Sequence, residues 1–171
     1  MEENKFEAVG CLVLTVSDTR TPATDRSGAL IVERLTSLGH RVIDHSIIAD
    51  EASLITTRVE HAVRNDEIDI IITTGGTGIT RRDVTPDAIA KIATKHIPGF
   101  GELFRYLSYA EIGASTIQSR ADAWLCESTI VFALPGSVGA VRLALDKILL
   151  DQLDSRTKPC NFIQLLPRIK G

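Results

Sequence analysis

The sequence predicts an α/β fold: a doubly wound, mostly parallel sheet with helices on both faces. Four short apolar runs rich in β-branched residues are typical of strands that are buried on both faces of a parallel sheet. Segments with apolar residues at helical spacing separate these runs, and the alternation of strand and helix favours a layered domain with right-handed crossovers. The four runs are residues 11–16, 42–48, 68–73 and 129–134.

Two helices are predicted between the first three strands. Apolar residues at helical spacing cover 31–38, and Gly39 follows as a C-terminal stop. A second apolar stripe covers 55–63. We expect Asp50 to cap this second helix, with Glu51 in its first turn, where the helix dipole favours an acidic side chain.

Further helices are predicted after the third strand. Thr85 and Pro86 open one of them, with a capping hydroxyl and a proline whose missing N–H is no loss at a helix start. Residues 101–123 are also expected to be helical, although their periodicity is weaker. An apolar stripe over 138–148 predicts a last helix, which runs toward Leu150.

A length of 171 residues predicts a single domain, 1–171. Residues 1–9 and 164–171 are expected to be loosely ordered ends. The segment 161–167 is apolar for a terminus. Packing on the domain or on a neighbouring subunit is one interpretation of this tail, and a terminal strand is another.

Charge and cysteine content exclude several classes of protein. The 19 basic and 22 acidic side chains give a net charge of −3, which offers no electrostatic reason to expect a nucleic-acid partner. Three cysteines without a Cys-x-x-Cys pair argue against a disulfide framework and favour a reducing compartment. The N-terminus lacks the features of a signal peptide, and no apolar stretch approaches the roughly 18 residues of a membrane span. We therefore expect a cytoplasmic protein that does not bind membranes.

Glycines, hydroxyls, acids and arginines gather in the loops that follow the four predicted strands. In an open parallel sheet, ligands bind in the crevice beyond the carboxyl ends of the strands. These loops therefore predict the position of the functional site. They are residues 17–28, 49–51, 74–86 and 135–139.

The loop after the third strand carries the sharpest motif. Gly75, Gly76 and Gly78 allow positive φ angles and a close approach of the backbone to an anion. Their N–H groups, with Thr77 and Thr80, are suited to a phosphate or to other ligand oxygens. The loop lacks the Gly-Lys-Ser/Thr of a P-loop and the spacing of a dinucleotide fingerprint. A tight turn with no ligand is the alternative interpretation.

Asp50 and Asp83 are the candidate metal-binding acids. Phosphoryl chemistry on a nucleotide needs Mg²⁺, which binds one or two carboxylates together with substrate oxygens and water. Two aspartates on neighbouring loops would meet that need. The alternatives are structural, because Asp50 could cap a helix and Asp83 could pair with Arg81 or Arg82.

Ser137 lies between a strand and a helix, as a hydrolase nucleophile would. Pro135 stands two residues earlier, so the Gly-x-Ser-x-Gly spacing is absent, and the last histidine, His96, precedes the serine instead of following it. A serine triad is therefore disfavoured, and we expect Ser137 to contact a ligand or to cap the next helix. The four histidines show no metal-binding spacing and are interpreted as structural.

Together these motifs make the chain resemble the MogA/MoaB family of molybdenum-cofactor biosynthesis. The resemblance runs from about residue 10 to residue 161, nearly the whole chain, with the motifs in family order. Its segments are residues 14–18 (LTVSD), 26–28 (RSG), 73–78 (TTGGTG), 83–88 (DVTPDA), 98–102 (PGFGE) and 134–137 (LPGS). Residues 102–105, 111–113, 118–120, 135–137 and 156–162 are similar to the MoaB branch, whereas 49–51 and 82–86 match the MogA pattern.

The resemblance implies a doubly wound α/β fold that binds molybdopterin. It also implies an activity, the transfer of AMP from Mg-ATP to the terminal phosphate of molybdopterin with release of pyrophosphate. Asp50 and Asp83 would be the catalytic residues and would hold Mg²⁺ with the substrate phosphates. The residues implied in binding molybdopterin and ATP are Ser17, Asp18, Ser27, Gly28, Gly75, Gly76, Thr77, Gly78, Arg82, Glu102, Ser119, Arg120, Pro135, Gly136 and Ser137.

Two other functions are compatible with the same residues. One is a molybdopterin-binding or carrier protein of the pathway without catalysis, and the other is an unrelated nucleotide-binding domain. The family further implies a homo-oligomer, with a hexamer favoured over a trimer by the MoaB-like segment 99–121 and the apolar tail. Other proteins of the cofactor pathway are possible partners.

Overall fold

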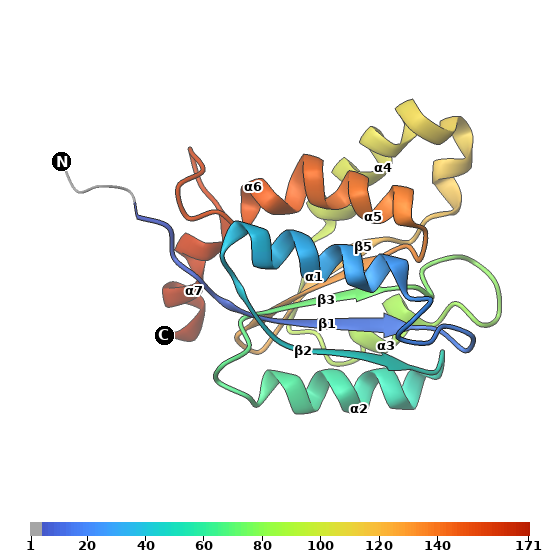
Figure 1. The fold of residues 1–171 in the computed structure, drawn as a ribbon, viewed down its shortest axis with the longest axis horizontal. Coiled ribbons are helices and arrows are strands. Elements are labelled where there is room, and N and C mark those ends of the chain that lie inside the picture. The colour runs from blue at the N-terminus through green and yellow to red at the C-terminus, as the bar shows by residue number, and fades with distance from the viewer. Residues whose placement is uncertain (1–4) are drawn as a thin grey trace.

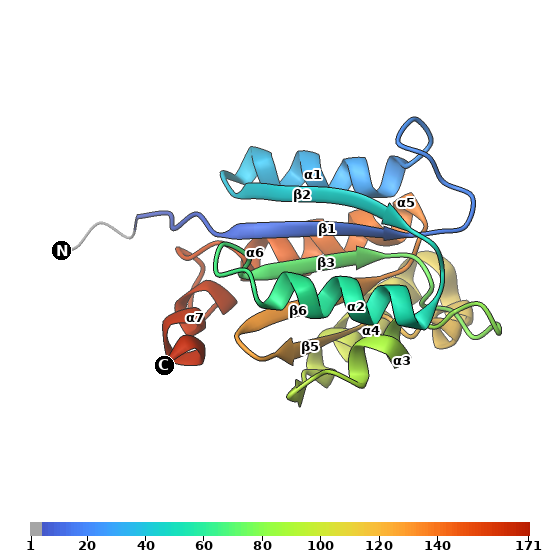
Figure 2. The same ribbon diagram turned by 90° about the horizontal axis from the view of Figure 1, so that it is seen from below.

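Six strands form one sheet with the order β2-β1-β3-β6-β5-β4 (Figure 1). The protein is described here by a computed structural model, which covers residues 5–171. β1, β2, β3 and β6 are parallel to one another. At one side, β5 pairs antiparallel with β6 and β4 pairs antiparallel with β5, and Figure 2 shows the opposite direction of β5. The strands are β1 (Gly10–Val16), β2 (Arg41–Ile48), β3 (Ile70–Thr74), β4 (Lys95–His96), β5 (Asp122–Cys126) and β6 (Thr129–Leu134).

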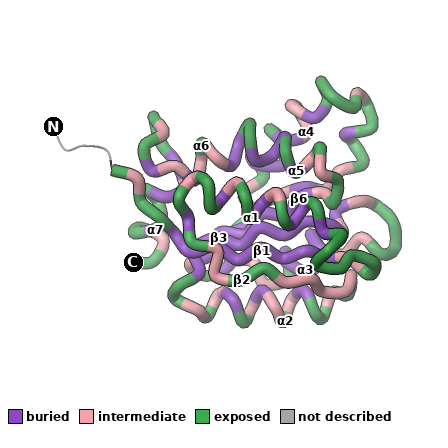
Figure 3. Tube along the Cα trace, viewed as in Figure 1, coloured by how far each residue is buried: buried purple, intermediate pink, exposed green. Residues whose placement is uncertain are grey.

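Helices cover both faces of this sheet, which confirms the predicted fold class (Figures 1 and 2). Because side chains alternate along a strand, Val13 faces the core beneath α1, α4 and α5, and Leu14 faces the core beneath α2 and α3. Figure 3 shows the buried strands between the more exposed helices. The helices are α1 (Arg26–Leu38), α2 (Ala52–Val63), α3 (Thr85–Ala90), α4 (Pro98–Ile112), α5 (Val138–Ala144), α6 (Leu150–Gln152) and α7 (Phe162–Lys170), with a 3₁₀ turn η1 (Gly113–Gln118) and a π turn η2 (Leu145–Leu149).

The four predicted strands and the helices between them are confirmed, but the prediction of a helix through residue 123 is wrong. α4 ends at Ile112, where Gly113 takes a φ of +60°. After η1 the chain turns into β5, whose residues pair with β6. β5 was missed because its five residues are too short to show a clear period.

The helix starts also differ in detail from the prediction. α2 begins at Ala52 with Glu51 at the N-cap position and no side-chain cap, so Asp50 is not the cap of that helix. α3 begins at Thr85 after Val84, and Thr85 supplies no capping hydroxyl. Ser137 does cap α5, since its side chain accepts a hydrogen bond from the Ala140 N–H. The side chains of Asp50 and Thr85, both expected to be helix caps, therefore cap no helix and are available for other contacts.

The C-terminal segment is a packed helix, which corrects the expectation of a loosely ordered end at 164–171 and also excludes a terminal strand. Asn161 caps α7 through the Gln164 N–H, and Ile163 and Leu166 are buried in the core on the α1 side. Lys170 Nζ lies 2.5 Å from Asp69 Oδ1.

At the other end, residues 1–4 lie outside the described part of the chain. Residues 5–9 are held in place, because the Glu7 N–H donates to Ser155 Oγ at 2.9 Å and Val9 is buried. No helix among the described residues is long and apolar enough to cross a membrane.

We predict that Leu166→Ala lowers the free energy of unfolding by about 2–4 kcal/mol, because it removes apolar side-chain volume from the core. Leu165 is the matched control, since it is 38% exposed and its truncation should cost well under about 1 kcal/mol. Denaturant titration of both variants measures the difference. Equal losses would contradict the packing of α7 described above.

Candidate active site

The loops that follow β1, β3 and β6 meet at one edge of the sheet and enclose two adjoining cavities. The strand-end cavity, of about 420 Å³, is bounded by residues of the β1 loop, such as Ser17, and by Ser27. The glycine-loop cavity, of about 470 Å³, is bounded by residues 75–78 and by α4. Gly75, Gly136 and Ser137 line both cavities, so the two hollows adjoin at these residues.

The glycines of the β3 loop are required by their geometry. Gly75 and Gly76 have φ angles of +105° and +65°. A Cβ at Gly75 would lie 2.2 Å from the Val16 carbonyl oxygen, so the loop could not pass the end of β1 with any side chain there. The Gly75 N–H donates to the Leu134 oxygen at 3.0 Å, which ties the β3 loop to the end of β6.

Four backbone N–H groups at this edge are available to a ligand. Two other N–H groups of the loop are already paired. The Gly75 N–H donates to the Leu134 carbonyl oxygen, and the Gly78 N–H forms a hydrogen bond to Asp83 that lowers the pKa of that carboxyl. Within residues 5–171, the structure gives no acceptor to the N–H groups of Gly76, Thr77, Gly136 and Ser137. Unpaired N–H groups in a glycine-rich loop and at a helix start favour binding of an anion.

Asp50 points at the glycine-rich loop and is incompletely satisfied. A Cβ at Gly76 would lie 2.4 Å from Thr85 Oγ1 and 2.9 Å from Asp50 Oδ1. Both of these oxygens are buried, and neither has a hydrogen-bond partner among the described residues. Burial raises the pKa of Asp50, and the nearby charges of Asp18 and Asp83 raise it further. A cation at this position would give the Asp50 oxygen a partner and would offset the repulsion between Asp50 and the carboxylates of Asp18 and Asp83.

Asp83 is held in its ionised form on the same loop. Its Oδ2 accepts from the N–H of Thr80 at 2.8 Å and from the Thr80 hydroxyl at 2.6 Å. Burial alone would raise the pKa of Asp83, but these hydrogen bonds, the Gly78 N–H and the charge of Arg120 outweigh it and lower the pKa. A Cβ at Gly78 would lie 2.8 Å from Asp83 Oδ2, so Asp83, like Asp50, lies against the glycine-rich loop.

Asp18 joins the loops after β1, β2 and β3. It accepts from Arg82 Nε at 3.1 Å and from Arg82 Nη2, and its other oxygen accepts from the Asp50 N–H at 3.0 Å. The hydrogen bond from Arg82 holds the pKa of Asp18 below its usual value, with a further contribution from the Asp50 N–H. Asp18 and Arg82, both predicted to bind substrate, therefore bind each other in this structure.

Arg120 was predicted to contact an anionic substrate, and the structure places it as a clamp on the glycine-rich loop. Its Nε donates to the backbone carbonyl oxygen of Gly78 at 2.7 Å, and its Nη2 donates to the backbone carbonyl oxygen of Asp83 at 2.5 Å. Its Nη1 contacts both carboxylate oxygens of Asp87 at 3.0 and 2.9 Å. Ser119, next to it, lines the glycine-loop cavity.

The remaining predicted residues are divided between the site and its surroundings. Ser27 donates to the Gly136 oxygen at 2.8 Å and lines the strand-end cavity, and Pro135 lines the glycine-loop cavity. Gly28 and Glu102 line neither cavity. Gly28 packs against a polar cluster, and Glu102 is exposed on α4.

Sequence reasoning missed that polar cluster. Asp25 caps α1 through the Gly28 N–H, accepts from the Thr15 hydroxyl at 2.6 Å, and lies 2.9 Å from His45 Nε2. Burial would raise the pKa of Asp25, but these hydrogen bonds hold it below its usual value. The sequence held only part of the signal for this cluster. Asp25 stands at a recognisable N-cap position before Gly28, but His45 lies on β2, and its contact with Asp25 arises only in the folded chain.

A doubly wound sheet with a glycine-rich loop, unpaired amides and two aspartates at its carboxyl edge defines a class of protein, the α/β domains that bind phosphate-bearing ligands at that edge. The family model described as "Probable molybdopterin binding domain" matches residues 12–155. The chain belongs to this molybdenum cofactor biosynthesis family.

Relatives and solved structures agree with this assignment. Proteins named Molybdenum cofactor biosynthesis protein B are 46% identical over 155 residues in Bacillus cereus (88% of this chain and 92% of the relative) and 41% identical over 150 residues in Escherichia coli (88% of each). A crystal structure of Molybdenum cofactor biosynthesis protein B has a TM-score of 0.86 at 40% identity, covering 95% of this chain and 96% of that one. The tungsten cofactor synthesizing protein MoaB from Pyrococcus furiosus has a TM-score of 0.78 at 33% identity, covering 96% and 99%.

We predict that Asp50→Asn raises the melting temperature at pH 7. The raised pKa means that the folded protein binds a proton at Asp50 more readily than the unfolded chain does, so the free energy of unfolding falls as the pH rises from about 4, the usual pKa of aspartate, through the folded pKa. Asparagine removes that loss. Below about pH 4 the wild type is protonated in both states, and the two melting curves should converge. A variant that melts lower than the wild type at pH 7 would contradict this account of Asp50.

Proposed function

We propose that the chain transfers the adenylyl group of Mg-ATP to the terminal phosphate of molybdopterin and releases pyrophosphate, in the biosynthesis of the molybdenum cofactor. The observation that carries this proposal is the pair of aspartates against the glycine-rich loop. Asp50 has a buried oxygen without a partner among residues 5–171, and Asp83 is held in its ionised form. A protein that only binds a pterin has no need of an incompletely satisfied acid at this position.

The chain's part in this reaction is to hold two anionic substrates together. The N–H groups of Gly76 and Thr77 on one loop, and of Gly136 and Ser137 on the other, line adjoining cavities and can donate to phosphate oxygens. Two phosphate-bearing substrates that occupy these cavities would meet near Gly75, where the loops touch. Such positioning replaces a bimolecular encounter by a reaction within one complex.

Asp50 and Asp83 fit a divalent cation that arrives with the triphosphate. Mg²⁺ binds one or two carboxylates and completes its shell with phosphate oxygens and water. When bound, it neutralises charge on the triphosphate during phosphoryl transfer. No group of three or more His, Cys, Asp or Glu side chains in residues 5–171 is placed to hold a metal ion.

The reaction itself needs no protein nucleophile. An oxygen of the terminal phosphate of molybdopterin forms a bond to the α-phosphorus of ATP, and the bond between that phosphorus and the bridging oxygen of pyrophosphate breaks. Pyrophosphate leaves with the electron pair of the broken bond. The protein contributes position and electrostatic stabilisation, which dominate catalysis of this kind of transfer.

Binding of molybdopterin without adenylyl transfer is the second candidate function. It is favoured by the state of the two arginines that were predicted to bind substrate. Arg82 is bound to Asp18, and Arg120 is bound to Asp87 and to the loop carbonyls. Neither guanidinium is directed to a substrate phosphate in this arrangement, so charge neutralisation would depend on the cation, the amides and Arg20, which lines the strand-end cavity.

We predict that Asp50→Asn and Asp83→Asn each lower the rate of ATP-dependent adenylylation of molybdopterin by about 100-fold or more. Their effect on the Kd for molybdopterin should stay within about threefold, because the expected loss lies in the transition state. Asp151→Asn, an exposed aspartate on α6, is the matched control and should keep full activity.

Formation of adenylylated pterin and release of pyrophosphate are measured together. Full turnover in Asp83→Asn would refute the assigned role of that residue. A wild type that binds molybdopterin without ATP-dependent release of pyrophosphate would establish the second candidate function.

We also propose that the chain acts as a homo-oligomer, a hexamer in preference to a trimer, and that it can associate with other proteins of the pathway. Large apolar side chains are exposed along α4 and η1, where Tyr106 is 77%, Tyr109 62% and Ile117 80% exposed. An exposed apolar surface of this kind is typical of an interface. Light scattering is expected to give six times the monomer mass of 18.6 kDa, and a monomer would overturn the proposal.

A further inference from the structure

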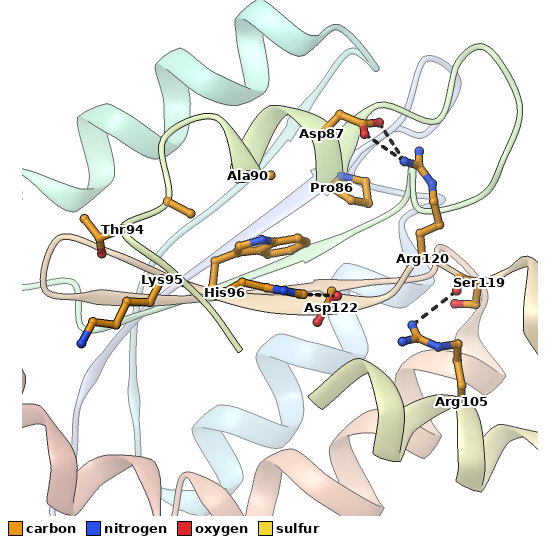
Figure 4. Close-up of a pocket in the computed structure, with 12 residues that line it drawn as sticks. Pro86, Asp87, Ala90, Thr94, Lys95, His96, Arg105, Ser119, Arg120 and Asp122 are labelled. Atoms are coloured by element: carbon orange, nitrogen blue, oxygen red, sulfur yellow. Dashed lines mark hydrogen bonds and ion pairs between the residues drawn. The ribbon is translucent and has the colours of Figure 1, made fainter. Parts of the chain in front are cut away.

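A third cavity, which we call the tryptophan cavity, lies outside the proposed active site. Its volume is about 630 Å³, within the range of roughly 300–1,000 Å³ that small-molecule sites occupy. α3, the turn after it, β4, β5 and one side chain of α4 enclose it (Figure 4). It shares only Ser119 with the glycine-loop cavity and no residue with the strand-end cavity.

One part of the tryptophan cavity is flat and apolar. Trp124 of β5 is buried, and the ring of His96 stacks on it with 5.8 Å between ring centroids and 27° between planes. His96 Nε2 lies 2.7 Å from Asp122 Oδ2, which fixes the orientation of the imidazole, while half of its side chain stays exposed. Pro86, Ala90 and Ala93 add an apolar wall. Such a surface suits a planar ring.

The cavity also carries positive charge without a counter-ion. Five fully charged side chains line it, the cations Lys95, Arg105 and Arg120 and the acids Asp87 and Asp122. Asp87 is paired with Arg120, and Asp122 with His96. In the described part of the chain, Lys95 and Arg105 form no ion pair. Figure 4 shows them at opposite ends of the cavity, and Arg105 is the one beside Ser119.

Arg105 is the better placed of the two cations. Its Nη1 donates to the Ala121 oxygen at 2.9 Å and approaches the Ser119 oxygen at 3.5 Å, and Figure 4 shows its guanidinium beside Ser119. The backbone thus orients a half-buried guanidinium, whose Nε and Nη2 donate to no group within residues 5–171. A guanidinium with free donors beside a serine hydroxyl is suited to a phosphate or carboxylate.

We propose that the tryptophan cavity is a second ligand site, for a planar heterocycle that carries a phosphate group. The ring would lie against His96 and the apolar wall, and the phosphate would bind Arg105 and Ser119, which lie side by side in Figure 4. The ligand would lie beside Arg120, which also holds the carbonyls of Gly78 and Asp83. A ligand in the cavity would therefore contact the arginine that holds the glycine-rich loop, which carries the proposed catalytic residue Asp83.

Trp124 is the single tryptophan of the chain, so its fluorescence reports directly on this cavity. We would titrate the full-length protein with AMP as the probe, and with adenosine and inorganic phosphate as its two halves. A saturable change with AMP is expected, with at least about tenfold weaker binding of either half alone. No saturable change at millimolar AMP, or phosphate that binds as tightly as AMP, would overturn the proposal.

Matched variants locate the bound probe. Arg105→Gln and His96→Ala should each raise the Kd for AMP by about tenfold or more, Arg105→Lys should restore part of the affinity, and Arg142→Gln on α5 should leave it unchanged. Gly136→Asp places a carboxylate where the active-site cavities meet and should also leave it unchanged. An AMP response that survives Arg105→Gln and is lost in Gly136→Asp would place the nucleotide in the active site and refute the second site.

Thermal melts by circular dichroism show whether Arg105→Gln is folded, and His96→Ala, which changes a half-exposed side chain, provides the independent test if it is not. The outcome does not depend on the proposed adenylyl transfer. A protein without that activity still binds AMP here if the inference is right, and an active protein without a fluorescence response refutes it.

Discussion

The architecture of the functional edge depends on one close approach of backbone to backbone. Gly75 passes the end of β1 so closely that a Cβ would meet the Val16 oxygen at 2.2 Å, and its N–H bonds the last carbonyl of β6. The ends of three parallel strands are thereby fastened at one residue. The unpaired amides of the neighbouring loops lie around that point, so the two cavities exist because a residue without a side chain stands between them.

The electrostatics of this edge follow from a shortage of positive charge. Asp18, Asp50 and Asp83 are close enough for the first and last to raise the pKa of the second, and the nearest guanidinium, Arg82, is bound to Asp18. Arg20 lines the strand-end cavity and adds positive charge there. In the proposed reaction, backbone dipoles and a cation that arrives with the substrate would supply the remaining positive charge, in agreement with a chain whose net charge is −3.

Much of the fold was predictable because the parallel strands are nearly continuous apolar runs, a pattern that few other structures produce. β5 escaped prediction since its five residues alternate weakly and are stabilised by pairing with β6, which is a tertiary effect. The loops of the site were predictable for the same topological reason that places ligands at the carboxyl edge. The partners of individual side chains were not, as the Asp18–Arg82 pair joins residues 64 positions apart.

Two residues at the functional edge depart from the helix-capping role that their residue types favour. Asp50 and Thr85 are both residue types that favour helix starts, and both were expected to cap. In the structure neither does so, and both turn a buried oxygen toward Gly76 instead. Residues that depart from their local structural preference in this way are expected at functional sites, where a side chain is kept for binding and not for stability.

Asp69 has a further consequence, for the engineering of this chain. It accepts from the Gly10 N–H at the start of β1 at 2.9 Å and binds Lys170 near the end of α7, so the first strand and the last helix meet at one carboxylate. This lies at the amino ends of the strands, away from the loops of the functional edge (Figure 1). Immobilisation through the C-terminal helix is thus expected to leave the loops of the functional edge accessible, provided that any linker begins beyond Lys170.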